Sequence, residues 1–436
     1  MTTTGMIPNG IDHRFHGLPH PVVPASFRSW RAGVVRSGRL PIIAIAGLRG
    51  KTTIIRLLDH IIKTAGHKTA LWTSTGVEIN GRPQVGELGA WKEALGRVMD
   101  GDVSVAIQEL EWATVLAAGL PPGFYPIVTI TNLCGNDEVC LLHREAQLAH
   151  KSMPKIIAAA DPNGVIVLNG EDFTLVDSMT SSPDQPAVLY SLSRMAPLLR
   201  QHLARGGMAA WRDGEVLRLG NMVTAPVAGH TPALPYALSG DATFQVTNVL
   251  AAVSTARMMG IPLETIEMAI ESYDPPARRM LGTFSVFSLD GVRIVIDRAS
   301  PSWALRPVLR ALRTHARGRL IAAIGKMEGV SIADVEEVGR MIGRDADALV
   351  LHNHQVNPDR VSSFLQGVTR AFNPPVVLRV SSEGRAIGAV LRRAKPRDTV
   401  LILADDPLKA YQAVQRAIRL AAPVVPAHQP ELPIAP

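Results

Sequence analysis

Cysteine is almost absent from this chain, since only Cys134 and Cys140 occur among its 436 residues. Their spacing matches neither a zinc-binding set nor a disulfide framework, and so few thiols are typical of a reducing cytoplasm. The start of the chain lacks the charged and apolar regions of a signal peptide. No apolar run reaches the roughly 20 residues that span a bilayer. We therefore expect a cytoplasmic protein with no membrane partner.

Aromatic residues are also scarce, at 5% of the chain, and no dense basic tract has aromatics between its charges. The pattern of a nucleic-acid-binding surface is therefore missing, and nucleic acid is not an expected partner. Hydrophobic residues make up 47% and charged residues 19%, which indicates a globular chain of two or three domains. A formal charge of +7 suits anionic ligands such as nucleotides or carboxylates.

Short apolar runs alternate with helical stretches from Pro41 onward. This alternation predicts an α/β fold with a mostly parallel, doubly wound sheet. In the first half we expect a helix over 51–66, another over about 144–159, and strands at 42–47, 68–74, 103–110, 126–133 and 164–172. The Asp213-Gly214 pair within 209–219 predicts a β-hairpin, and two helices follow at 247–260 and 262–273.

A second α/β unit is predicted after these helices, with strands at 291–299, 318–325, 346–353, 375–381 and 398–405. The expected organisation is a lead segment at 1–40, a central ATP-binding domain at 41–280, a Rossmann-like α/β domain at 281–421 and a Pro-rich tail at 422–436. The five prolines of the last fifteen residues favour a disordered tail.

The sequence Gly47-Leu48-Arg49-Gly50-Lys51-Thr52-Thr53 lies between a predicted strand and a predicted helix. Glycines allow the backbone to approach phosphate oxygens, and the helix N-terminus offers free N–H groups and the positive end of its dipole. Lys51 supplies a charge for the β- and γ-phosphates, and Thr52 a hydroxyl for Mg²⁺. This context predicts a phosphate-binding loop, although an ordinary strand–helix turn with an incidental Lys is the alternative.

The loop is shorter than a full Walker A motif, and its G-x-x-G-K-T-T form resembles the loop of the Mur ligase superfamily. Further stretches resemble motifs of that family in the same order, closest to the ligase region of cyanophycin synthetase and to poly-γ-glutamate synthase. These stretches are AIQELEWATVLAAGL (106–120), VTITNLCGND (128–137), GVIVLNGED (164–172), FQVTNVLAA (244–252), PARRM (276–280), IVIDRASPSWAL (294–305) and RAIGAVLRRAKPRDTVLILADD (385–406). The resemblance covers roughly residues 41–420.

The resemblance implies an ATP-dependent, ADP-forming amide ligase that works through an acyl phosphate. Its cofactors would be ATP and Mg²⁺, and its substrate an amino acid or a peptide; homo-oligomer formation is left open. The implied catalytic residues are Lys51, Glu109 and Arg279. The implied nucleotide-binding residues are Gly47, Gly50, Lys51, Thr52, Thr53, Asn248, Arg279 and Asp297. The implied Mg²⁺ ligands are Thr52, Glu109 and Asp137.

The sequence also departs from the family pattern. The acidic loop reads Asn136-Asp137 where the family has Asp-His, Ser300 replaces a His, and Arg278 replaces a Gly. Many Mur ligases carry a carbamylated Lys, but no Lys occurs here between Lys155 and Lys326. A second hypothesis is therefore a nucleotide-binding partner that regulates an active ligase. An unrelated P-loop kinase or NTPase is a third hypothesis, which leaves the matches at 244–305 unexplained.

Two further patterns lie outside these motifs. The run Arg306, Arg310, Arg313, Arg317 and Arg319 places four guanidinium groups on one helix face. It is either a solvated face or a clamp for an acidic polymer or carboxylate. His143, His150 and His230 show no metal-ligand spacing, and we expect them to be ordinary polar residues.

Overall fold

The computed structural model describes residues 18–133, 144–275, 280–328, 330–353 and 355–421. The chain divides into two compact units. The first comprises Met1–Met280 with Trp303–His315, and the second comprises Leu281–Ser302 with Ala316–Pro436. Among the described residues, no helix is long and apolar enough to cross a membrane.

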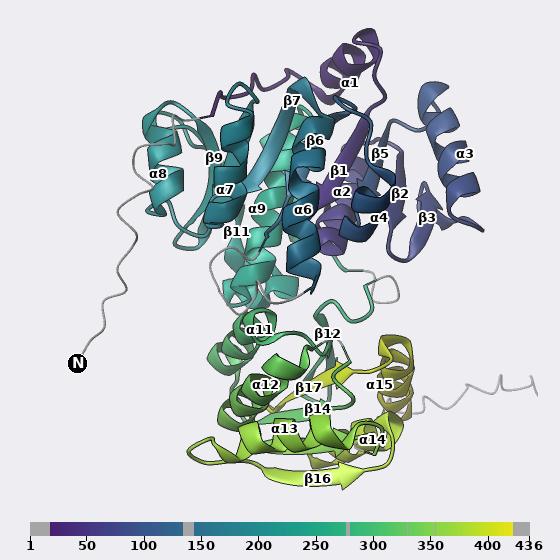
Figure 1. The fold of residues 1–436 in the computed structure, drawn as a ribbon, viewed down its shortest axis with the longest axis vertical. Helices are drawn as coiled ribbons and strands as arrows, with labels where there is room; N and C mark the ends of the chain where they lie inside the picture. Colours follow the sequence, from purple (N-terminus) through teal and green to yellow (C-terminus); the bar gives the residue numbers. More distant parts are fainter. Residues whose placement is uncertain (1–17, 134–143, 276–279, 329, 354, 422–436) are drawn as a thin grey trace, which may run out of the picture. The chain divides into compact units, whose positions relative to one another are not determined.

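The first unit is built on one large sheet of eleven strands, in the order β11-β10-β9-β8-β7-β6-β1-β5-β2-β3-β4 (Figure 1). Seven neighbouring strands from β9 to β2 run parallel, and antiparallel hairpin strands extend the sheet at both edges. The strands are β1 (Ile42–Ala46), β2 (Thr69–Thr73), β3 (Gly76–Ile79), β4 (Arg82–Pro83), β5 (Val105–Glu109), β6 (Tyr125–Ile130), β7 (Ala160–Asn169), β8 (Ala187–Ser191), β9 (Met208–Asp213), β10 (Val216–Gly220) and β11 (Val227–His230).

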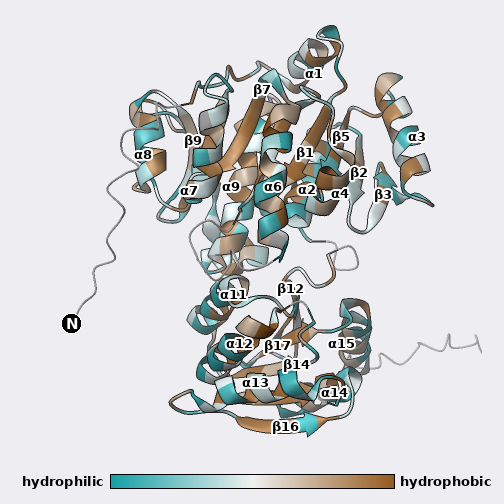
Figure 2. Ribbon diagram, viewed as in Figure 1, coloured by the Kyte–Doolittle hydropathy of each residue, from teal (hydrophilic) through white to brown (hydrophobic). Residues whose placement is uncertain are grey.

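Helices cover both faces of this sheet. Side chains alternate along a strand, so Ile43 and Ile45 of β1 enter one core with α1, α2, α9 and α10. Ile42 and Ala44 enter the opposite core with α3, α4, α6, α7 and α8. Strands buried on both faces are apolar throughout, as the hydropathy of β1 illustrates (Figure 2).

The helices of this unit, in chain order, are α1 (Phe27–Arg36), α2 (Lys51–Thr64), α3 (Leu88–Met99), α4 (Trp112–Ala118), α6 (Arg144–Ala159), α7 (Phe173–Asp177), α8 (Pro197–Ala204), α9 (Thr243–Met258), α10 (Leu263–Glu271) and α11 (Ser302–His315), which begins one residue before the unit boundary. Short 3₁₀ turns lie at Ser178–Ser181, Thr231–Ala233 and Pro235–Gly240.

The second unit has a six-stranded sheet in the order β12-β13-β17-β14-β15-β16. Only the β12–β13 pair is antiparallel, which is the arrangement of an open α/β sheet. α14 and α15 share one core with the sheet. The elements are β12 (Ser285–Leu289), β13 (Val292–Arg298), β14 (Leu320–Ile324), α12 (Ile332–Asp345), β15 (Ala348–His352), α13 (Pro358–Thr369), β16 (Val376–Val380), α14 (Glu383–Arg393), β17 (Thr399–Ala404) and α15 (Pro407–Ala421).

The predicted fold class is confirmed: a parallel-rich α/β sheet is followed by a second α/β unit. The hairpin at Asp213-Gly214 is present as β9–β10. Sequence periodicity missed α1, α3, α4, α7 and α8, the strands β3, β4, β11 and β12 near the sheet edges, and the central strand β8. Edge strands are short and half-exposed, so they lack the apolar run that identifies a central strand.

Candidate active site

The predicted phosphate loop lies directly after β1 and leads into α2, which begins at Lys51. Gly47 has φ of 143° and Gly50 has φ of 89°, a backbone region that favours glycine. A Cβ atom at Gly47 would overlap the Thr131 hydroxyl, and one at Gly50 would overlap the Asn248 side-chain oxygen. Gly50 caps α2 without a side-chain hydrogen bond. The helix N-terminus thus keeps the free N–H groups that bind anions.

Two residues after β6 hold the loop in shape. The Asn132 Oδ1 atom accepts hydrogen bonds from the backbone N–H groups of Leu48 and Arg49, at 3.2 and 3.3 Å. The Thr131 hydroxyl donates to the carbonyl of Arg49 at 2.6 Å. Both residues lie in the stretch 128–137 that resembles a family motif, but neither was predicted as a site residue. Their position after a strand parallel to β1 is the signal that could have identified them, because parallel strands end at one sheet edge.

Lys51 lies in a group of oxygen atoms. It is buried, with 9% of its surface exposed, and its Nζ atom donates to the Gly47 carbonyl at 3.0 Å. The same atom lies 3.8 Å from Glu109 Oε1 and 3.5 Å from Glu111 Oε1. The lysine charge is therefore fixed inside the loop, with two carboxylates as its counterions.

Glu109 ends β5, which pairs with β1 through Ile45. Its carboxylate accepts from the Thr52 hydroxyl at 3.2 and 3.3 Å and from the Ser74 N–H at 3.1 Å. Burial raises the pKa of Glu109, while the Lys51 charge opposes that rise. The Thr52 and Glu109 oxygens are hard ligands of the kind that Mg²⁺ prefers, so this pair fits the expected ion.

Asn248 and Thr53, two further residues predicted to bind the nucleotide, lie in different surroundings. Asn248 lies on α9, which packs on α2, and its side chain touches Gly50 although nearly 200 residues separate them. Its Nδ2 donates to Gln245 Oε1 at 3.0 Å, which fixes the amide beside the loop. Thr53 is 5% exposed and lies in the first turn of α2. Its backbone, rather than its buried side chain, is available to a ligand.

The remaining predicted residues lie in the second unit or outside the described residues. Asp297 lies at the end of β13 in the second unit, where it is 1% exposed and its carboxylate accepts from the Arg298 N–H at 2.8 Å. Ser300, at the position of the family's His, is buried and donates to the Arg298 carbonyl at 3.0 Å. Arg279 and Asp137, like Asn136 and Arg278, lie outside the described residues.

A second polar cluster, which the sequence did not predict, follows three parallel strands of the second unit. Asp405 accepts from the Lys326 N–H and from the Asn353 side chain, both at 2.8 Å. The buried His352 ring places Nδ1 3.6 Å from Asp405 Oδ2, and burial lowers the pKa of His352. A Cβ atom at Gly325 would overlap both His352 and Asp405. These groups lie at the strand ends where open α/β sheets bind ligands.

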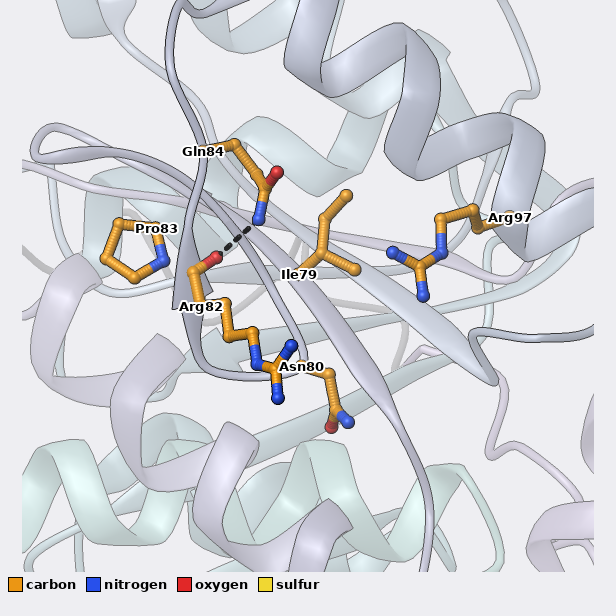
Figure 3. A pocket seen from close by; sticks show the side chains of 6 residues that line it. All are labelled: Ile79, Asn80, Arg82, Pro83, Gln84 and Arg97. Atoms are coloured by element: carbon orange, nitrogen blue, oxygen red, sulfur yellow. Dashed lines mark hydrogen bonds between the residues drawn. The ribbon is translucent and has the colours of Figure 1, made fainter.

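A hollow of about 610 Å³ lies apart from these residues, along the β3–β4 hairpin (Figure 3). Its lining is Ile79, Asn80, Arg82, Pro83, Gln84 and Arg97. Gln84 Nε2 donates to the Arg82 carbonyl at 2.8 Å, and Arg97 is held by Asp102 at 2.5 and 2.8 Å. No predicted site residue lines this hollow.

Comparison with known sequences identifies relatives over most of the chain. Residues 283–405 match the family described as "Mur ligase, glutamate ligase domain". Cyanophycin synthetase of Synechocystis sp. is 25% identical over 390 residues, covering 86% of this chain and 44% of the relative. UDP-N-acetylmuramoyl-L-alanyl-D-glutamate–2,6-diaminopimelate ligase of Thermosynechococcus vestitus is 24% identical over 379 residues, covering 84% and 72%. The chain spans less than half the length of the cyanophycin synthetases it matches.

Solved structures show the same fold. Escherichia coli FolC in complex with DHPP and ADP aligns with a TM-score of 0.61 at 16% identity, covering 91% of this chain and 94% of FolC. MurF ligase of Thermotoga maritima in complex with ADP aligns with a TM-score of 0.57 at 13% identity, covering 91% and 83%. The predicted resemblance is confirmed: the chain is similar in sequence to cyanophycin synthetases and to a Mur ligase over most of its length, and its residues 283–405 match the glutamate ligase domain of the Mur ligases.

Proposed function

We propose that this protein is an ATP-dependent, ADP-forming ligase that joins a carboxylate to an amine. One observation carries the proposal: Lys51, Thr52 and Glu109 converge beside a loop whose two glycines cannot be replaced without overlap. A charge, a hydroxyl and a carboxylate beside a helix N-terminus are the parts that position a nucleoside triphosphate for phosphoryl transfer.

The reaction has two steps. A substrate carboxylate oxygen attacks the γ-phosphorus of ATP, and ADP leaves with the electron pair of the broken P–O bond. An amine nitrogen then attacks the acyl carbon, the C–O bond to phosphate breaks, and phosphate leaves while the nitrogen loses a proton. The chain contributes mainly by positioning the reactants and by stabilising charge, and these two effects account for most of the catalysis of phosphoryl transfer.

Each loop residue has a defined task in this proposal. The backbone of Gly47–Gly50 cradles phosphate oxygens, and Lys51 offsets the negative charge that builds on them. Thr52 and Glu109 hold Mg²⁺, which supplies further charge neutralisation when it is bound. Asn248, on α9, packs its side chain against Gly50 of the loop.

Further assignments follow from the resemblance. We assign Thr53 to the phosphates through its backbone, Asp137 to Mg²⁺, and Arg279 and Asp297 to the nucleotide. The functional division would be a lead segment at 1–40, an ATP-binding domain at 41–280, a ligase domain at 281–421 and a tail at 422–436. Conformational closure that completes a catalytic site is common in such enzymes.

The substrates we propose are an amino acid or a short acidic peptide, because the name of one relative describes a ligase that acts on an alanyl-glutamate compound and diaminopimelate. The two cysteines of the chain support a reducing, cytoplasmic location. We propose no nucleic-acid or membrane partner, and homo-oligomer formation stays open.

The test is release of ADP and phosphate from ATP in the presence of single amino acids and short acidic peptides, screened in pairs. A ligase releases ADP only when both a carboxylate and an amine substrate are present. Binding of ATP without any pair that triggers release would contradict the proposal and favour the nucleotide-binding regulator. Release that needs neither substrate would favour a simple NTPase.

A further inference from the structure

Three metal-ligating side chains meet at the outer edge of the large sheet, on β11 and α10. His230 ends β11, the edge strand labelled in Figure 1. Its Nδ1 atom lies 3.1 Å from Glu267 Oε1 and 3.6 Å from Glu271 Oε1. One ligand atom from each of the three residues lies within 4.8 Å of the other two. The cluster therefore joins a strand and a helix through one nitrogen and two carboxylates.

The backbone is shaped to bring these groups together. Gly229, directly before His230, has φ of 151°, and a Cβ atom there would overlap the Ile270 side chain. The helix α10 can therefore approach the edge strand closely at this point. The Tyr236 hydroxyl donates to the Ile270 carbonyl at 3.1 Å and fixes the same helical turn. Glu267 and Glu271 are four residues apart, so they share a helix face.

A single imidazole N–H group does not bind both carboxylates of this cluster. One Nδ1–H group donates to one acceptor, yet two carboxylates from adjacent turns point at the same nitrogen. Like charges four residues apart on a helix repel each other, so a cation between them is favoured. A divalent ion in the place of that proton would contact all three ligands at once.

We propose that His230, Glu267 and Glu271 form a binding site for a divalent transition metal of the Zn²⁺ class. Zinc bonds to His nitrogen and carboxylate oxygen are about 2.0–2.2 Å long, and tetrahedral geometry then separates two ligand atoms by roughly 3.3–3.5 Å. The observed separations of 3.1 and 3.6 Å bracket that value. His230 is 48% exposed and the glutamates 32% and 36%, so water can enter and fill the fourth position.

The ligand set also defines which ions are excluded. An imidazole nitrogen suits Zn²⁺, Ni²⁺ and Cu²⁺, whereas Mg²⁺ and Ca²⁺ prefer oxygen ligands alone. The site is thus chemically distinct from the Thr52–Glu109 pair proposed for Mg²⁺, and it shares no residue with it. Metal bound here would cross-link the edge strand β11 to α10 and stabilise the folded state by linkage.

The experiment is calorimetric titration of the full chain, stripped with a chelator and free of any affinity tag, with ZnCl₂ and separately with MgCl₂. We expect one equivalent of Zn²⁺ to bind at this site, no Mg²⁺ signal that depends on His230, and a higher melting temperature with Zn²⁺. His230→Asn, Glu267→Gln and Glu271→Gln should each weaken that equivalent at least about tenfold, since even outer-shell partners are worth this much. Glu264→Gln, on the same helix and exposed, is the matched control and should bind as the parent does.

Zinc binding that persists unchanged in all three ligand variants would overturn the proposal, and so would a parent protein that binds none. Each variant's melting temperature without metal shows that it still folds. The titration contains no nucleotide, so its outcome is independent of ligase activity. Lys51→Met, which should strongly lower ATP turnover, should bind Zn²⁺ like the parent.

Discussion

Lys51 is held inside the phosphate loop by the Gly47 carbonyl and the two carboxylates of Glu109 and Glu111. A methionine would keep most of the buried stem but remove the charge. We predict that Lys51→Met lowers ATP turnover by about 10²-fold or more, the range seen when a charge-stabilising group is removed. Release of ADP gives the rate, and circular dichroism monitors the fold. Lys63→Met, at the other end of the same helix, is the control; a parental rate in Lys51→Met would refute the loop assignment.

Asn132 serves the loop through two hydrogen bonds rather than through contact with a ligand. Removing its oxygen leaves the N–H groups of Leu48 and Arg49 without that acceptor, and each such bond is worth about 1 kcal/mol. We predict that Asn132→Ala weakens ADP binding about tenfold, measured by calorimetric titration. The exposed Asn163 provides the control Asn163→Ala. Equal affinities in both variants would show that the loop keeps its shape without Asn132.

Glu109 is a case in which function and stability oppose each other. Burial raises the pKa of its carboxyl above the usual 4.5, so between the unfolded and folded pKa values the folded state holds more protons. The contribution of this carboxyl to the free energy of unfolding is then fully present below pH 4.5. It decreases as pH rises through the raised pKa and stays lower at higher pH. We predict that Glu109→Gln raises the melting temperature at neutral pH and flattens this fall, while it removes Mg²⁺-dependent ATP binding. A lower melting temperature at neutral pH would show that the Lys51 charge dominates instead.

At the scale of elements, the α12–α13 pair depends on glycine for close packing. A Cβ atom at Gly367 would overlap the Glu336 carbonyl, and one at Gly339 would overlap the Phe364 carbonyl. The two helix backbones therefore touch directly. We predict that Gly367→Ala destabilises the protein by about 2 kcal/mol, a typical cost of overpacking, measured by urea unfolding. Gly384→Ala on α14, where the added Cβ meets nothing within 4 Å, should be neutral or slightly stabilising.

Most central strands of both sheets were predictable because each is marked by its own sequence, but the buried central strand β8 was missed. β1 and β17 are continuous apolar runs, and the loop glycines with Lys51 form a local motif. Several strands near the sheet edges were not predictable in the same way, although the edge strand β16 was predicted. β11 has four residues, Val227–His230, and two of them are glycine and histidine, so neither alternation nor an apolar run identifies it.

The residues of the candidate site were also only partly predictable from the sequence. Glu109 and Asn248 were found only through resemblance, because nothing local in their segments indicates contact with residues 47–52. Asn132 and the His230 cluster depend on strand order and on helix packing over long sequence separations. Such contacts are consequences of tertiary structure and leave no periodic signal in one sequence.

At the scale of the whole molecule, the positive charge is unevenly distributed. Residues 281–421 contain 18 Arg and 3 Lys against 9 Asp and 4 Glu, which gives +8, while residues 1–280 contain 24 basic and 24 acidic residues. The basic excess therefore lies in the part of the chain that contains the match to the glutamate ligase domain, residues 283–405. A positive field of this kind attracts anionic substrates, which supports a carboxylate-bearing substrate over a neutral one.

The distribution of lysine over the whole chain leads to the last prediction. A carbamate forms on a neutral primary amine, which the always-protonated arginines cannot offer. Nine lysines occur, and none lies between Lys155 and Lys326. The lysines of α6, Lys151 and Lys155, are exposed rather than buried in a site. Lys155 Nζ also donates to the Leu116 carbonyl at 3.0 Å. The Lys51 amine already contacts the Gly47 carbonyl and the carboxylates of Glu109 and Glu111.

We therefore predict that ATP turnover is independent of bicarbonate. The measurement is ADP release in buffer purged of carbon dioxide, with and without added bicarbonate, and the two rates should agree. Reversible loss of activity on purging would contradict the prediction and require a carbamylated lysine. Without the carbamate, a second metal ion must be held by carboxylates or by the substrate's own oxygens, which are ligands that Mg²⁺ accepts readily. Agreement of the rates would thus group the enzyme with ligases that dispense with the modification.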